Sequence, residues 1–190
     1  GSITPKGWLR HMLDLEKDGM TGRLKEVSPW LNFEKSSWGN KEGKGGFGWE
    51  ELPYWLKGYG DLGYVLGDAQ IIADARRWIE AVMASQREDG WFGPRELLTS
   101  LKGKPDLWPH MVMLNILQSY YEFTGDERVT DGVYFARTMD LFLDLIEHPE
   151  KLDAPQAGAE PDLSPYYEMF KVPPDVTHEE LKLARTATRC

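Results

Sequence analysis

The sequence predicts an all-α protein built from helical hairpins of the kind that form an (α/α) toroid. A first observation is a repeated unit, in which Glu50 and Asp106 each stand three residues before a proline, and each proline opens an apolar run. A second observation is that a Gly-Asp pair ends each run, at 67–68 and at 125–126. The carboxylates are 56 residues apart and the Gly-Asp pairs 58, which is a period typical of stacked supersecondary units.

Composition limits the classes of partner. The chain of 190 residues is long enough for one domain with a core, and its formal charge of -9 argues against nucleic acid or an anionic membrane as a partner. No apolar run approaches the roughly 20 residues of a membrane span. The single cysteine, Cys190, excludes an intrachain disulfide and a cysteine-based zinc site within this chain, and it leaves the cellular compartment open.

The N-terminal part predicts one short helix followed by a loop. Residues 9–17 have apolar side chains at helical spacing, and Asp18-Gly19 stops the pattern. Residues 19–48 are rich in glycine and carry four scattered aromatics, so we expect a long loop there. Loops of this length are usually functional or disordered, and aromatic side chains favour the first alternative.

The first hairpin is predicted over residues 50–86. Its first helix begins at Glu50 or Glu51 with Pro53 in the first turn, where the missing N–H costs nothing. Gly67 ends this helix, and Asp68 caps a second, amphipathic helix over 69–86. The apolar stripe of the first helix consists of Leu52, Trp55, Leu56, Tyr59, Leu62 and Leu66.

The second hairpin repeats this arrangement. Residues 107–124 are apolar almost all round, which predicts a helix buried on several sides, and Asp126 is expected to cap a helix that ends near Glu147. The inward stripe expected for that last helix is Val129, Val133, Ala136, Met139, Leu143 and Ile146. Two hairpins with inner and outer helices predict an incomplete (α/α)6 barrel or a small open array, with bare helix flanks that favour self-association.

The C-terminal part differs in composition. We expect a partial barrel over residues 1–150, and a linker followed by a short helical tail over 151–190, because proline, alanine, glycine and acids dominate after Pro149. Thr177 and Glu180 form a capping box. Residues 166–184 are similar to the opening of a J-domain, but they lack the His-Pro-Asp that chaperone stimulation requires.

Candidate functional residues gather where the two inner helices begin. In a toroid, Glu50, Glu51 and Asp106 come to one rim, and paired carboxylates in an aromatic funnel are typical of glycoside hydrolysis. The alternative is that acids in a first helical turn only stabilise the helix dipole. The candidate substrate-binding residues are Glu50, Tyr54, Trp55, Asp106, Trp108 and His110. The sequence shows no metal-ligand spacing, and a lone His110 is more typical of a hydrogen-bonded wall residue than of a metal ligand.

Four motifs together resemble a known family. They are Pro5-Lys6-Gly7-Trp8-Leu9-Arg10, Trp49-Glu50-x-x-Pro53-Tyr54-Trp55-Leu56-x-Gly58, Gln86-x-x-Asp89-Gly90-Trp91-Phe92-Gly93 and Tyr121-Glu122-x-Thr124-Gly125-Asp126. As a set, over about residues 1–147, they resemble the N-terminal part of the barrel in glycoside hydrolase family 127, the β-L-arabinofuranosidase-like group.

This resemblance implies an (α/α)6 barrel that removes terminal arabinofuranose from glycans. It also implies a cysteine nucleophile, a glutamate acid/base and zinc, all located later in the barrel than this chain reaches, so no catalytic residue is carried over. No cofactor is identifiable from the residues themselves. The expected partner is a carbohydrate substrate. A non-catalytic α-toroid binding module is the alternative, because Gln86-x-x-Asp89-Gly90-Trp91-Phe92 is also similar to the structural repeats of terpene cyclases.

Overall fold

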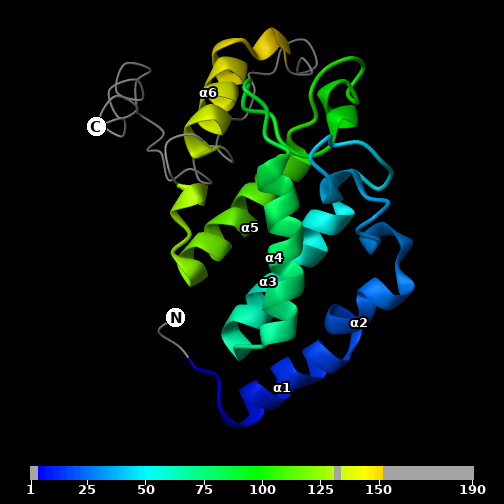
Figure 1. Cartoon of the computed structure of the whole chain (residues 1–190), viewed down its shortest axis with the longest axis vertical. Coiled ribbons are helices and arrows are strands. Elements are labelled where there is room, and N and C mark those ends of the chain that lie inside the picture. The colour runs from blue at the N-terminus through cyan, green and yellow to red at the C-terminus, as the bar shows by residue number, and fades with distance from the viewer. Residues whose placement is uncertain (1–3, 131–133, 152–190) are drawn as a thin grey trace, which may run out of the picture.

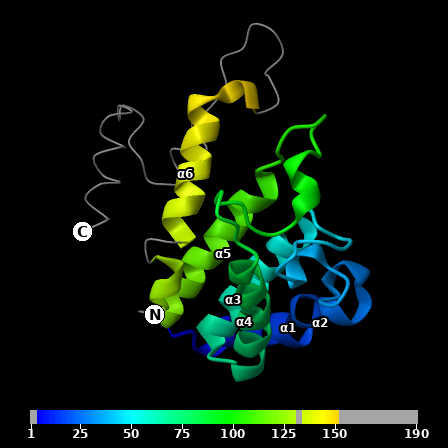
Figure 2. The ribbon, with the colours of Figure 1, turned by 45° about the horizontal axis from the view of Figure 1, so that its top comes forward.

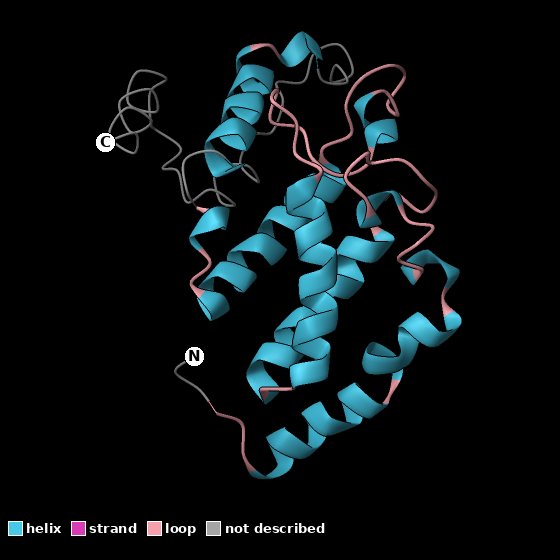
Figure 3. Cartoon of the chain, viewed as in Figure 1, coloured by secondary structure: helices cyan, strands magenta, loops and turns pink. Residues whose placement is uncertain are grey.

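The computed structural model describes residues 4–130 and 134–151, and within these ranges it contains helices and no β-strand (Figures 1 and 3). The α-helices are α1 (Gly7–Asp18), α2 (Met20–Val27), α3 (Glu51–Leu66), α4 (Ala69–Ala84), α5 (Trp108–Thr124) and α6 (Tyr134–Glu147). Short 3-10 turns are η1 (Pro29–Leu31), η2 (Ser37–Gly39), η3 (Arg95–Leu98), η4 (Glu127–Val129) and η5 (Pro149–Lys151). The predicted all-α class is confirmed. The J-domain-like segment 166–184 and nearly all of the expected linker and tail lie outside the described residues.

The hairpin of α3 and α4 forms as the sequence predicts. Gly67 ends α3 in the left-handed conformation with φ 67°, which glycine adopts without strain. Asp68 Oδ1 then accepts hydrogen bonds from the backbone N–H groups of Gln70 and Ile71, at 3.1 and 3.0 Å, and caps α4. The Ile71 side chain packs against Gly63, where a Cβ would collide with it, so glycine brings the two helices close together.

Helix α3 is the centre of the core, and α5 runs beside it in the same direction (Figures 1 and 2). At the N-terminal ends, the indole of Trp49 bonds to Asp106, and at the C-terminal ends the rings of Tyr64 and Phe123 stack with centroids 4.4 Å apart. Contacts at both ends in the same order make the pair parallel, and α4 packs on α3 as the antiparallel partner. A parallel pair with an antiparallel partner is the observed arrangement, and both the toroid and the closed (α/α)6 ring stay predictions.

One face of α5 is less buried than its sequence predicts. Met113, Ile116 and Leu117 are buried, whereas Trp108 and Phe123 are 48% and 42% exposed. The prediction of burial on several sides is therefore wrong for part of this helix.

The predicted loop over 19–48 is wrong in its first third, because α2 occupies residues 20–27. Tertiary contacts hold this short helix: Trp55 Nε1 donates to the Thr21 carbonyl oxygen at 2.9 Å, and Lys25 Nζ donates to Tyr59 Oη at 3.0 Å. Lys25 also forms an ion pair with Asp74 on α4. Helix α2 thus depends on α3 and α4 more than on its own sequence.

The second hairpin also differs from its prediction. Asp126 caps the 3-10 turn η4, where its Oδ1 accepts from the Arg128 N–H at 3.2 Å, and it does not begin the helix that ends at Glu147. In α6, Phe142 and Leu145 are buried, while the expected inward residues Leu143 and Ile146 are only half-buried. The buried face of α6 is therefore offset by one residue from the predicted stripe.

Candidate functional site

The N-terminal ends of α3 and α5 are joined by two crossed hydrogen bonds, which we call the tryptophan clasp (Trp49, Glu50, Asp106 and Trp108). Trp49 Nε1 donates to Asp106 Oδ2 at 3.0 Å, and Trp108 Nε1 donates to Glu50 Oε2 at 2.6 Å. Asp106 Oδ1 also accepts from the backbone N–H of Trp108 at 3.0 Å, so both of its oxygens are engaged. The clasp places the carboxylates that precede the two helices at one rim.

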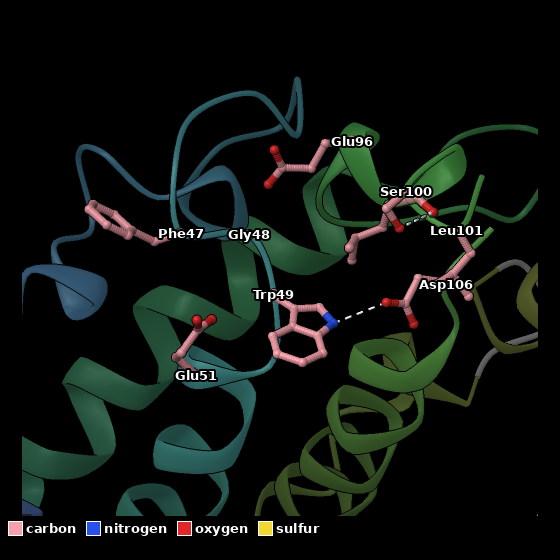
Figure 4. Close-up of a pocket in the computed structure, with 9 residues that line it drawn as sticks. Phe47, Gly48, Trp49, Glu51, Glu96, Ser100, Leu101 and Asp106 are labelled. Atoms are coloured by element: carbon pink, nitrogen blue, oxygen red, sulfur yellow. Dashed lines mark hydrogen bonds between the residues drawn. The ribbon is translucent and has the colours of Figure 1, made fainter. Parts of the chain in front are cut away.

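A pocket of about 670 Å³ opens beside the clasp (Figure 4). Its volume is within the range of small-molecule sites, roughly 300–1,000 Å³. Three segments supply the lining, namely the approach to α3 with the first residue of that helix, the turn around η3, and Asp106 two residues before α5. The lining residues are Phe47, Gly48, Trp49, Glu51, Glu96, Leu97, Ser100, Leu101 and Asp106.

Backbone contacts fix these segments against one another. The fully buried Trp38 donates from Nε1 to the Trp49 carbonyl oxygen at 3.0 Å. The Asp106 N–H donates to the Leu97 carbonyl oxygen at 2.7 Å, which ties the turn around η3 to the start of α5. A Cβ on Gly48 would overlap Glu96 Oε1 and Ser37 Oγ, so the chain passes close to both side chains at this glycine. These contacts therefore fix the positions of the segments that line the pocket.

The lining carries negative charge and aromatic surface. Glu51, Glu96 and Asp106 are its three ionisable residues, and no lysine, arginine or histidine is among the lining residues. Trp49 is 47% exposed and Phe47 is 36% exposed. Chemically, this combination offers hydrogen-bond acceptors beside a flat apolar face.

Three of the sequence-predicted site residues lie at the rim. Asp106 lines the pocket, while Glu50 and Trp108 face each other across the clasp. Tyr54, half-exposed on α3, is not among the lining residues of this pocket.

Two other predicted residues lie elsewhere. Trp55 is 8% exposed and stacks on Tyr59 with ring centroids 4.4 Å apart, against α2. His110 is 1% exposed and packs against the rings of Trp38, Trp91 and Phe92, with centroid distances of 5.7, 4.2 and 4.7 Å, respectively. In this structure neither residue lines the pocket.

His110 is neutral in the core. Its Nε2 lies 2.7 Å from the Phe92 carbonyl oxygen, which can only accept, so this nitrogen carries the proton. Burial lowers the pKa of His110 from 6.5 to about 4, and the Phe92 carbonyl and Asp106 oppose this effect only in part. The contacts show a hydrogen-bonded histidine in the core, away from the wall of the pocket.

Sequence reasoning missed most of the pocket. Glu51 was expected at the rim but was not among the predicted substrate-binding residues, and Trp49 stood inside the second motif without an assigned role. Glu96, Leu97, Ser100 and Leu101 lie in a segment that carries no motif. The available signal was the order of the elements. Because α3 and α5 were expected to begin at one rim, the segment that leads into α5 has to pass the N-terminal end of α3.

The zinc that the family resemblance implies has no ligand set in the described residues. Within 4–130 and 134–151, no three His, Cys, Asp or Glu side chains are grouped so that they could hold a metal ion. Zinc therefore stays an expectation from the resemblance alone. No helix in the same ranges has the length and apolarity needed to span a membrane.

Comparison of the chain with protein-family models, with curated proteins and with solved structures finds no match.

Proposed function

We propose that this chain binds saccharide in the rim pocket and forms the substrate-side wall of a glycoside hydrolase that acts on arabinofuranosyl-containing glycans. The observation that carries the proposal is the pocket itself, in which a half-exposed Trp49 stands beside Glu51 and Glu96. An indole face packs on the C–H face of a sugar ring, and carboxylates accept hydrogen bonds from its hydroxyls. The motif resemblance supplies the choice of arabinofuranosyl glycans.

A non-catalytic carbohydrate-binding module is the second candidate, and one observation favours it. Both oxygens of Asp106 accept hydrogen bonds within the clasp, and Glu50 accepts one from Trp108. Carboxylates committed to indole and backbone N–H groups are poorly placed to transfer a proton to a leaving group. In this alternative the clasp only shapes the binding surface.

Binding is tested by isothermal titration of the full 190-residue chain with arabinofuranosyl oligosaccharides. We expect Trp49→Ala to weaken binding by about tenfold, because loss of one stacking face removes roughly 1.4 kcal/mol. Trp8→Ala is the matched control, since Trp8 is 78% exposed on α1 and is not part of the pocket. Equal effects of the two substitutions, or no binding by the unmodified chain, would overturn the proposal.

A turnover assay tests whether this chain is itself catalytic. For this chain we expect bound glycan without release of arabinose from an aryl β-L-arabinofuranoside, with or without added zinc, because the resemblance carries no catalytic residue onto it. Release that requires zinc and is abolished by Trp49→Ala would instead assign catalysis to this chain.

A further inference from the structure

Helix α1 turns its polar face toward the protein and its apolar face toward solvent. Figure 1 shows α1 at the edge of the molecule, where it contacts α2 and α3. A surface helix normally does the opposite, with its apolar stripe on the core and its charges in water. The half-buried residues of α1 are Arg10, Leu13, Asp14 and Lys17, which share one face at helical spacing, and only Leu13 is apolar. Lys17 forms an ion pair at 3.5 Å with Asp68, at the start of α4, which favours this orientation.

The outward face of α1 is apolar. Trp8, Met12 and Leu15 recur at i, i+4 and i+7 and therefore share the side of the helix that faces away from the protein. Each is at least 49% exposed, and Trp8 is 78% exposed. Leu9, beside them, is exposed as well. A contiguous apolar stripe on the outer side of a helix indicates a surface that another protein surface covers.

The charges of α1 are divided between its two ends. Lys6 and Arg10 make the N-terminal half basic, whereas the C-terminal half is acidic because its three carboxylates outnumber Lys17. A second copy of α1 in the same direction would place like charges side by side. A copy in the opposite direction places cations beside acids and also opposes the two helix dipoles, and both effects are favourable. The charge pattern thus selects an antiparallel copy of the same helix.

We propose that the outward face of α1 is the interface of a homodimer, in which α1 packs antiparallel against α1 of a second copy about a two-fold axis at Met12. Residues at similar distances from Met12 on its two sides then face each other. Trp8 lies beside Leu15 of the second copy, and Lys6 lies beside its Glu16. Such a contact uses the same surface on both chains, so it closes at two copies. The inference is independent of saccharide binding, because no residue of α1 lines the pocket.

Analytical ultracentrifugation of the full chain tests the dimer and its charge pairing. Lys6→Glu and Glu16→Lys should each raise the monomer–dimer dissociation constant about tenfold, because the contact occurs twice in the dimer and becomes repulsive. The combined variant Lys6→Glu/Glu16→Lys should return the constant to within about threefold of the original value. Both single changes suit the dipole of α1, so loss of the helix would not explain weaker association.

The combined variant also serves as the control for contacts within one chain. Thr21 Oγ1 donates to Glu16 Oε2 at 2.6 Å, and Glu16→Lys removes this hydrogen bond. An effect of that loss would persist in the combined variant, so failure to restore dimerisation would contradict the proposed pairing. A monomer at every concentration would overturn the inference and would favour another occupant of the α1 face, either residues 152–190 of the same chain or a different protein.

Disulfide cross-linking tests the direction of the two helices. The background is Cys190→Ser, so that the introduced cysteine is the only one in the chain. Met12→Cys should cross-link two chains under mild oxidation, because the two copies of this position meet at the two-fold axis. Trp8→Cys should not, because its two copies are about 12 Å apart along the helix, whereas a disulfide needs Cα atoms within about 7 Å.

Val65→Cys is the control for random collision, since Val65 is also half-exposed but lies on α3. Cross-linking of the Met12 variant above this control, without cross-linking of the Trp8 variant, would support the antiparallel pair. Equal cross-linking at both positions would indicate a parallel pair, and cross-linking of the Met12 variant no faster than the control would exclude the interface.

Discussion

At the scale of single residues, two glycines allow the cost of a positive φ to be measured apart from the cost of a steric overlap. Gly67 and Gly93 have nearly the same positive φ, 67° and 69°. A Cβ on Gly67 would meet nothing within 4 Å, whereas a Cβ on Gly93 would overlap the ring of the fully buried Trp38. We expect Gly67→Ala to lower the free energy of unfolding by about 1 kcal/mol and Gly93→Ala by about 2–4 kcal/mol.

Urea unfolding monitored by circular dichroism measures both values. Gly67→Ala serves as the control, because it carries the cost of the φ value alone. Losses of equal size would show that the ring of Trp38 moves aside without cost.

The burial of His110 predicts that the free energy of unfolding falls in acid. Its pKa is about 4 in the folded chain and 6.5 as the ordinary value, so folding favours the neutral form. This stabilisation is complete above pH 6.5 and is lost as pH falls from 6.5 to 4, by roughly 3 kcal/mol in total. We expect His110→Gln to remove this part of the pH dependence in urea unfolding.

His11→Gln is the matched control, because His11 is exposed on α1. The comparison is the difference between each variant and the unmodified chain at the same pH, since carboxylates also titrate in this range. An unchanged slope in His110→Gln between pH 6.5 and 4.5 would contradict the predicted burial of a neutral imidazole.

The candidate site was predictable only where it coincides with a helix start. Asp106 was found because a carboxylate three residues before a proline marks such a start. Trp55 was assigned to the rim from its neighbours in sequence, yet it points to the Thr21 carbonyl on α2. Glu96 was not found, since no local pattern indicates that the turn around η3 reaches Gly48.

At the scale of elements, the tryptophan clasp is expected to couple α3 and α5 with unequal strength at its two bonds. The two donors, Trp49 and Trp108, are almost equally exposed, but the bond to Asp106 is partly buried because Asp106 is 9% exposed, whereas the bond to Glu50 is exposed. A charged hydrogen bond shielded from water contributes about 1.5–3 kcal/mol, and an exposed one less than about 1 kcal/mol.

Two double-mutant cycles measure these coupling energies by urea unfolding. The cycle of Trp49→Phe with Asp106→Ala should give the larger value, and the cycle of Glu50→Ala with Trp108→Phe is its internal control. A larger coupling energy for Glu50 and Trp108 than for Trp49 and Asp106 would show that the exposed hydrogen bond couples the helices more strongly.

Helices with strong local signals were predicted, and those that depend on tertiary contacts were not. Pro53, Gly67 and Asp68 mark the bounds of the α3–α4 hairpin within the chain itself. Helix α2 has eight residues, contains Gly22 and buries no side chain, so its stability comes from α3 and α4. Its existence could not be predicted without knowing those neighbours.

At the scale of the whole molecule, exposed apolar side chains concentrate in the N-terminal helices. Those of residues 8–30 are Trp8, Leu9, Met12, Leu15, Met20, Val27 and Trp30. Trp8, Met12 and Leu15 follow helical spacing on one face of α1, which has no buried residue. Self-association was expected from the bare flanks of inner helices, and the structure adds this surface as a stronger cause.

We therefore predict self-association through α1. The sedimentation coefficient of the full chain should rise with protein concentration, and Met12→Lys should weaken this dependence because a charge in the apolar stripe opposes contact. Val65→Lys is the control, since Val65 is also half-exposed but lies on α3. A monodisperse monomer at high concentration would contradict the prediction.

The parallel pair of α3 and α5 has a mechanical consequence. The clasp fastens the pair at one end, and the stacked rings of Tyr64 and Phe123 fasten it at the other. Two helices joined at both ends resist sliding along each other, because a shift of α5 along α3 by one helical turn would break both junctions together. Asp106 lines the pocket and belongs to one of the two junctions, so the same contacts that keep the helices in register also fix this part of the pocket wall.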